Sequence, residues 1–173
     1  MNTIKNLPEV WMRGPVEGVP ALLQPVAHAL LQAKEEVEEM MKDFPENFLW
    51  QRSAGIASVG FHLQHLSGVI NRLFTYARKE ILTQTQLDTL NREGVEDAAI
   101  IAETLLSTFR KEIDNAIEQI RQTSEQSLTE PRGIGRKQIP TTVAGLLFHA
   151  AEHTMRHVGQ LSVTVRVVKS TCN

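Results

Sequence analysis

Apolar residues recur at alternating steps of three and four in four long segments of this chain, residues 21–41, 56–79, 98–120 and 141–168. This spacing places apolar side chains along one face of an α-helix. Residues 163–168 are rich in β-branched side chains, but they continue the helical stripe of the last segment. The pattern therefore predicts an all-α fold, a four-helix bundle, with no strands between the helices.

The segments outside these helices are polar or rich in proline and glycine. Residues 1–20 contain three prolines and two glycines, which predicts an irregular N-terminal arm that lies across the folded body through Trp11 and Met12. Residues 82–94 are rich in threonine and glutamine, and residues 122–140 are polar. Both stretches are interpreted as connectors without regular structure.

Size and charge narrow the class of protein. A chain of 173 residues can bury an apolar core without disulfides or a structural metal, so we expect one domain over residues 1–173. The formal charge of -2, without a basic run, argues against a nucleic-acid partner. No signal peptide or apolar stretch of about 20 residues is visible, which argues against a membrane segment. The single cysteine, Cys172, suits a reducing compartment, so a cytoplasmic location is predicted.

Five of the six histidines fall in two clusters, His62 and His65 on the second predicted helix, and His149, His153 and His157 on the fourth. His153 and His157 occupy positions of the apolar stripe where a bundle core ordinarily holds leucine. Their i, i+4 spacing lets both side chains bind one ion. His65 can supply a third imidazole from the neighbouring helix.

Three imidazoles with an open coordination position are typical of a catalytic zinc site, and nickel, iron and copper also accept imidazole. The alternative is a set of hydrogen-bonded core histidines, which is the interpretation given to the isolated His28. A di-iron site is excluded, because no glutamate lies three residues before a clustered histidine. An inverted zinc-peptidase motif occurs at residues 149–153, but no acidic ligand follows it.

The sequences Gly60-Phe-His-Leu-Gln-His-Leu66 and His149-Ala-Ala-Glu-His-Thr-Met-Arg-His-Val-Gly-Gln-Leu161 resemble the DinB/YfiT-like superfamily. The arm around residues 9–15 and the stretch 136–142 are also similar to a DinB-type subgroup. The resemblance implies a four-helix bundle that holds a divalent metal, zinc or nickel foremost, through His65, His153 and His157. Arg156 departs from the family pattern, since many members have histidine there. His62 and His149 are then expected beside the ligands or facing the substrate.

The resemblance implies several functions, because the superfamily includes bacillithiol- and mycothiol-dependent S-transferases, maleylpyruvate isomerase-like proteins and metal-dependent hydrolases. The predicted function is a metal-dependent transferase or hydrolase that acts on a small molecule, with a low-molecular-weight thiol as cofactor. His149 or Glu152 is the candidate proton acceptor, although Glu152, which precedes a core-facing residue, is better interpreted as a surface carboxylate. The alternative function is a non-catalytic metal-binding or sensor module. A homodimer is compatible with the sequence.

The stretch before the fourth helix, residues 131–140, combines three cations with two glycines. Arg132, Arg136 and Lys137 are candidates for binding the carboxylates of a thiol cofactor, since arginine pairs with carboxylates in bidentate geometry. The positive end of the following helix adds to the same field. This stretch is therefore predicted to form the substrate end of the metal site. The alternative is a solvated loop.

Overall fold

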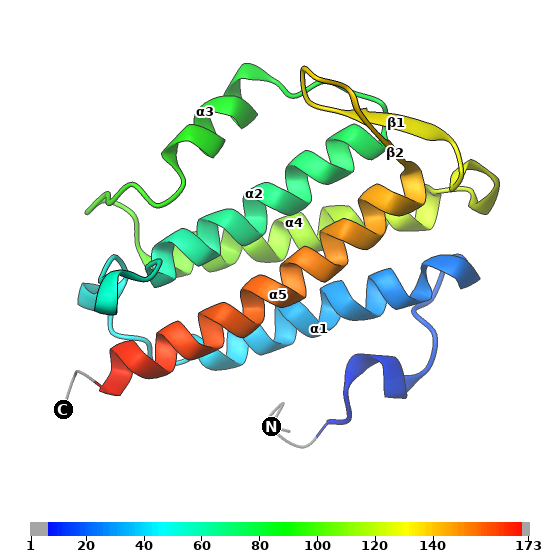
Figure 1. Ribbon diagram of the computed structural model, residues 1–173. Coiled ribbons are helices and arrows are strands. Elements are labelled where there is room, and N and C mark those ends of the chain that lie inside the picture. The colour runs from blue at the N-terminus through cyan, green and yellow to red at the C-terminus, as the bar shows by residue number, and fades with distance from the viewer. Residues whose placement is uncertain (1–6, 171–173) are drawn as a thin grey trace.

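The computed structural model describes residues 7–170, and its main elements are five α-helices and one two-stranded sheet (Figure 1). Cys172 lies outside the described residues. The elements are α1 (Gln24–Met40), α2 (Val59–Ala77), α3 (Gln84–Arg92), α4 (Ala102–Gln122), β1 (Pro131–Ile134), β2 (Ile139–Thr142) and α5 (Val143–Ser170), with short 3-10 turns at Val10–Arg13, Ala21–Leu23, Glu46–Phe48, Ser53–Gly55 and Glu125–Ser127.

Four of the helices form the predicted bundle. α5 packs against α1 and α2, and α4 packs against the same two helices, so the four apolar stripes face one another. The buried apolar side chains of all four helices form one core cluster. The all-α expectation is confirmed, and residues 163–168 are helical. Within the described residues, no helix is both long and apolar enough to cross a membrane.

The connector predicted at residues 82–94 contains a helix, α3, so that prediction was wrong. Thr83 and Gln86 form a capping box at its start, each side chain bonding the other residue's backbone N–H. None of its nine residues is buried. Apolar periodicity misses α3 because this helix has almost no apolar face, although the capping box itself is visible in the sequence.

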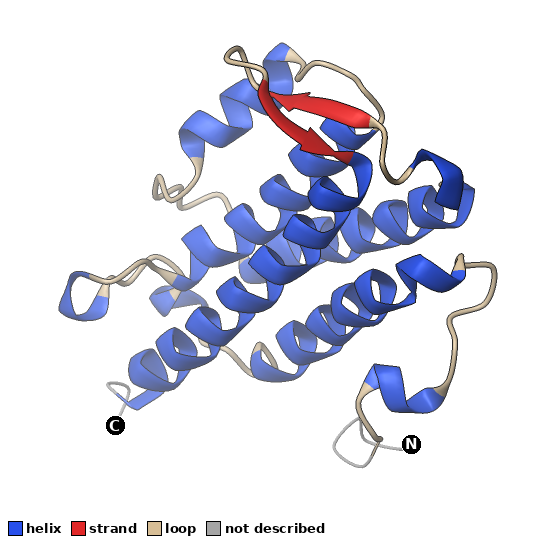
Figure 2. Cartoon of the chain, turned by 45° about the vertical axis from the view of Figure 1, so that its right-hand side comes forward, coloured by secondary structure: helices blue, strands red, loops and turns tan. Residues whose placement is uncertain are grey.

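Residues 131–142 form an antiparallel hairpin between α4 and α5, so the expectation of no strands between the helices was wrong. Pro131 pairs with Thr142 and Ile134 with Ile139 across the two strands. The turn contains Gly135 and Gln138 with positive φ angles of 63° and 47°. Figure 2 shows the hairpin at one end of the bundle, where β1 contacts α2 and β2 contacts α5.

The N-terminal arm lies along α1, but not through the expected side chains. Trp11 and Met12 are 62% and 59% exposed, whereas Val10 is buried. The Val10 N–H donates to Gln32, and Arg13 pairs with both carboxylate oxygens of Glu35 at 2.6 and 2.7 Å. Further along the arm, Val19 is buried in the core and the Gln24 side chain bonds the Val16 backbone, so apolar and polar contacts together attach the arm.

The packing of α4 generates the first prediction. Phe109 is fully buried, so Phe109→Ala leaves a cavity and is expected to lower the free energy of unfolding by about 3–5 kcal/mol. Val163→Ala, at a position that is 57% exposed, is expected to change it by less than about 0.5 kcal/mol. Urea denaturation followed by circular dichroism measures both, and equal effects of the two substitutions would contradict the core assignment.

Candidate metal centre

Helices α2 and α5 pack against each other (Figure 1), and this contact brings histidines from two distant parts of the sequence together. The ring centroids of His65 and His157 lie 4.4 Å apart, and those of His153 and His157 lie 4.6 Å apart. Nε2 of His65 is 3.0 Å from Nε2 of His153. One nitrogen from each of the three rings lies within 4.8 Å of the others, a geometry that can hold a metal ion.

Local helix geometry explains which rings meet. Side chains four residues apart lie on the same face of a helix, which places His153 above His157 on α5. His62 and His65, three residues apart on α2, face them from the other side of the contact. All three rings of this candidate group are partly buried, and the side chain of His65 is 18% exposed.

Glu93 holds His65 in place, and the sequence analysis missed this residue. Its side chain is only 5% exposed, and its two oxygens accept from His65 Nδ1 at 2.7 Å and from Arg72 Nη1 at 2.6 Å. Burial alone would raise the pKa of Glu93, but the hydrogen bonds from His65 and Arg72 outweigh it and keep the pKa below its ordinary value. Glu93 therefore stays ionised at neutral pH.

An ionised carboxylate can only accept hydrogen bonds, so His65 donates from Nδ1, and Nε2 is the ring nitrogen that faces His153. Histidines that bind metals commonly donate their second ring nitrogen to a carboxylate in this way. Two nitrogens bound to one zinc ion at about 2.0–2.1 Å, at a tetrahedral angle, are about 3.4 Å apart. The spacing of His65 Nε2 and His153 Nε2 is close to this value.

Two glycines let Glu93 approach α2. A β-carbon on Gly68 would lie 2.3 Å from a Glu93 oxygen and 2.5 Å from Arg72 Nη1, so any larger residue would force this ion pair to shift. Gly94 has a φ of 80°, and its N–H donates to the Gln64 side chain. The Glu93-Gly94 pair is the sequence signal for this anchor, but nothing in the sequence connects it to His65.

Burial disfavours the charged form of the other three rings, those of His62, His153 and His157. His62 is buried, and its Nδ1 lies 3.3 Å from Nδ1 of His157. Burial, followed by the neighbouring His65, lowers the pKa of His62 to about 4, and burial followed by His65 and the other nearby rings lowers that of His157 to about 4. Burial also lowers the pKa of His153. Neutral imidazole is the form that binds metals.

His153 distinguishes this cluster from an ordinary hydrogen-bonded core. Its Nδ1 is buried and has no hydrogen-bond partner within residues 7–170. A buried ring nitrogen without a partner costs free energy, so His153 is not a fully hydrogen-bonded core histidine, and its Nε2, which faces His65, is the nitrogen placed to bind a metal. The donor set, three neutral imidazoles of which one is oriented by a carboxylate, fits a divalent metal.

The candidate proton acceptors, His149 and Glu152, lie on α5 four residues and one residue before His153. His149 is half exposed, and its Nδ1 is 3.5 Å from the Glu152 carboxylate. Glu152 also pairs with Arg156, and this hydrogen bond lowers the pKa of Glu152. His149, Glu152 and His153 form a second group with metal-ligand spacing, but it is more exposed than the first.

The structure does not bring the hairpin cations to the histidines. Arg132 and Arg136 line a cavity of about 660 Å³ whose wall contains none of the histidines, and Lys137 is not part of this wall. Ten residues of α5 separate Val143, which follows the hairpin, from His153, a distance of about 15 Å along the helix.

Comparison with known families agrees with this geometry. Residues 29–161, which include all three clustered metal-ligand candidates, match the DinB superfamily. The chain belongs to the DinB superfamily. The comparison with curated proteins finds no match to this DinB-superfamily chain.

Two solved structures share the DinB fold seen here. A conserved protein from Enterococcus faecalis is 17% identical with a TM-score of 0.68, and the match covers 86% of this chain and 98% of that one. A structural-genomics target from Streptococcus pneumoniae is 16% identical with a TM-score of 0.62, covering 84% of this chain and 88% of that one. At these identities the likeness shows the fold.

The neutral rings generate a prediction for the metal-free protein. The unfolded chain binds these protons near pH 6.5, whereas folded His62 and His157 bind them only near pH 4. The free energy of unfolding should therefore fall as the pH drops from 6.5 to 4. The variant His62→Leu should reduce this fall by on the order of 2 kcal/mol.

Urea denaturation at several pH values, in the presence of a chelator, measures this effect. His28→Leu is the matched control, because His28 lies outside the cluster and contacts the Gly14 carbonyl on the arm. An equal pH dependence in wild type and His62→Leu would show that this ring is not buried in its neutral form.

Proposed function

We propose that this DinB-superfamily protein is a divalent-metal-dependent enzyme whose ion is held by His65, His153 and His157. The observation that carries the proposal is the convergence of one nitrogen from each ring within 4.8 Å. The metal we propose is zinc or nickel, with iron and copper as alternatives, because all four accept imidazole.

A divalent ion bound by three imidazoles lowers the pKa of a water or thiol at its open position towards neutrality. Neighbouring side chains hold the proposed ligands in position. Glu93 fixes the orientation of His65, and His62 supports His157 through the contact between their Nδ1 atoms. The low pKa of His157 and the lowered pKa of His153 mean that few protons compete with a metal for these two rings at neutral pH.

Partial exposure of the ligand side chains favours an enzyme over a closed structural site. We propose a small-molecule substrate attacked either by water, in a hydrolase, or by a low-molecular-weight thiol, in an S-transferase. His149 is the better candidate for the proton acceptor, because the pair with Arg156 makes the Glu152 carboxylate less basic. The ring of His149 lies 5.2 Å from that of His153.

Loss of any proposed ligand should remove the metal. His65→Ala, His153→Ala and His157→Ala are each expected to reduce bound metal from about one ion per chain to below about a tenth of that, because two imidazoles bind a divalent ion far more weakly. Elemental analysis by mass spectrometry measures the content. His28→Ala is the control and should keep the full amount, and an unchanged content in His153→Ala would contradict the ligand set.

The same proteins test the reaction class. Metal-loaded wild type should accelerate either the hydrolysis of p-nitrophenyl acetate or the reaction of cysteine with monochlorobimane, and the three ligand variants should not. Full metal content together with rates equal to those of the metal-free protein in both assays would instead support a non-catalytic metal-binding module.

Glu93 generates a separate prediction. Glu93→Gln preserves the shape of the side chain but removes the charge that orients His65, so metal affinity should fall about 10- to 100-fold. Competition with a chromogenic chelator measures the affinity. Glu96→Gln, an exposed glutamate three residues away, is the matched control and should bind metal like the wild type. Equal affinities of the two variants would contradict a positioning role for Glu93.

A further inference from the structure

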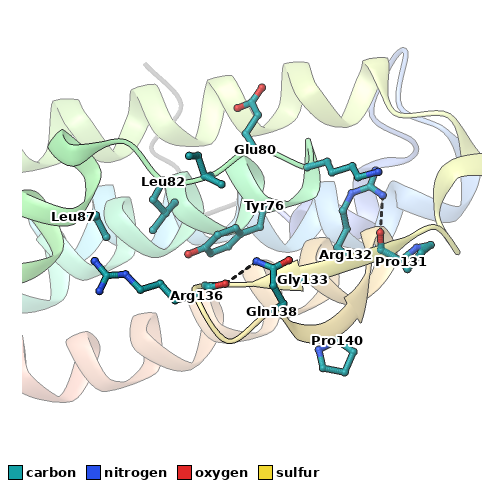
Figure 3. Close-up of a pocket in the computed structure, with 13 residues that line it drawn as sticks. Tyr76, Glu80, Leu82, Leu87, Pro131, Arg132, Gly133, Arg136, Gln138 and Pro140 are labelled. Atoms are coloured by element: carbon teal, nitrogen blue, oxygen red, sulfur yellow. Dashed lines mark hydrogen bonds between the residues drawn. The ribbon is translucent and has the colours of Figure 1, made fainter.

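The cavity lined by Arg132 and Arg136 lies at the end of α2 away from the histidines, under the hairpin (Figure 3). Its volume is about 660 Å³, within the range of small-molecule binding sites. The wall comes from three places in the sequence: the end of α2, the start of α3 and the hairpin. Lys79 has a φ of 65°, and this left-handed turn ends α2 before Ile81 and Leu82, which also line the cavity.

Much of the wall is apolar. Leu82 and Leu87 lie on one side, and Pro131 and Pro140 come from the hairpin (Figure 3). Ile81 is 85% exposed at the same cavity, an unusual position for a large apolar side chain. An apolar group bound here would cover Ile81 and gain from removing this surface from water.

The charged residues of the wall divide into two kinds. Arg132 is 10% exposed and already bonded, since it donates to the Ala77 carbonyl at 2.8 Å and pairs with Glu130 at 3.0 Å. It attaches the hairpin to α2. The one carboxylate, Glu80, pairs with Arg78 at 2.7 Å, so its charge is already compensated.

Lys79 and Arg136, the remaining charged residues of the wall, are not paired in this way. Neither side chain makes a hydrogen bond or ion pair with another residue of the described range 7–170, and the Tyr76 hydroxyl is likewise without a partner there. Figure 3 shows the Tyr76 hydroxyl on the side of the cavity towards which Arg136 extends. Two uncompensated cations and a hydroxyl donor beside an apolar wall are complementary to an anion with an apolar body.

We propose that this cavity binds a small organic carboxylate with an aromatic or branched aliphatic body. Arg136 pairs with the carboxylate, the Tyr76 hydroxyl donates to it, Lys79 adds positive charge to the same wall, and the apolar body lies against Leu82 and Leu87. This site is separate from the histidine cluster, and its occupation does not require the proposed metal.

Calorimetric titration with 4-phenylbutyrate, and with the neutral 4-phenylbutyramide, tests the proposal. The wild type should bind the carboxylate at least about tenfold more tightly than the amide, since a charge-assisted pair is lost with the amide. Arg136→Gln should weaken carboxylate binding about tenfold. The matched control is Lys137→Gln, which removes one charge from the same turn but not from the wall, and it should change the affinity less than about twofold.

Nuclear magnetic resonance locates the ligand. The amide signals of Gly133 and Gly135, which line the cavity, should shift during the titration, while that of Gly159, two residues after His157, should not. Absence of carboxylate binding, equal binding of the amide, equal weakening by the two charge variants, or shifts at Gly159 without shifts at Gly133 would each overturn the proposal.

Discussion

The contact between α2 and α5 has to accommodate four imidazole rings where a helical bundle ordinarily holds aliphatic side chains. Burying a ring nitrogen costs free energy unless the nitrogen is bonded. Glu93 satisfies His65, and His62 and His157 face each other, but His153 keeps a buried nitrogen without a partner in the described chain. These contacts all depend on the register of α2 against α5. The core packing that fixes this register therefore also determines which histidines meet.

The candidate metal ligands lie on the bundle helices α2 and α5, but other groups of the two proposed sites lie outside these helices. The apolar faces of four helices form the core, whereas polar segments between them carry the groups that adjust the two proposed sites. Glu93, directly after α3, bonds to His65, and Arg136 in the hairpin turn lines the cavity under the hairpin. Substitutions in these polar segments can therefore alter binding with little effect on the core.

The fold could be predicted where apolar periodicity is strong. The helical character of the four bundle segments is confirmed, because an amphipathic helix of 17 or more residues repeats its pattern several times. α3 and the hairpin were missed for the opposite reason. Neither element has a residue buried in the core, and their stability comes from the capping box at Thr83 and from cross-strand hydrogen bonds. Such short polar elements leave almost no periodic signal.

The sequence by itself determined the helical bundle, the DinB family and the two clusters of histidines, because each of these depends on residues that are close together in the chain. Only the tertiary structure decided which rings meet and which acid orients them, since Glu93 and His65 are 28 residues apart and His65 and His153 are 88 apart. The tertiary structure also places Arg132 and Arg136 in the wall of a cavity that contains none of the histidines. Contacts between distant residues depend on how the helices pack, and side-chain periodicity describes one helix at a time.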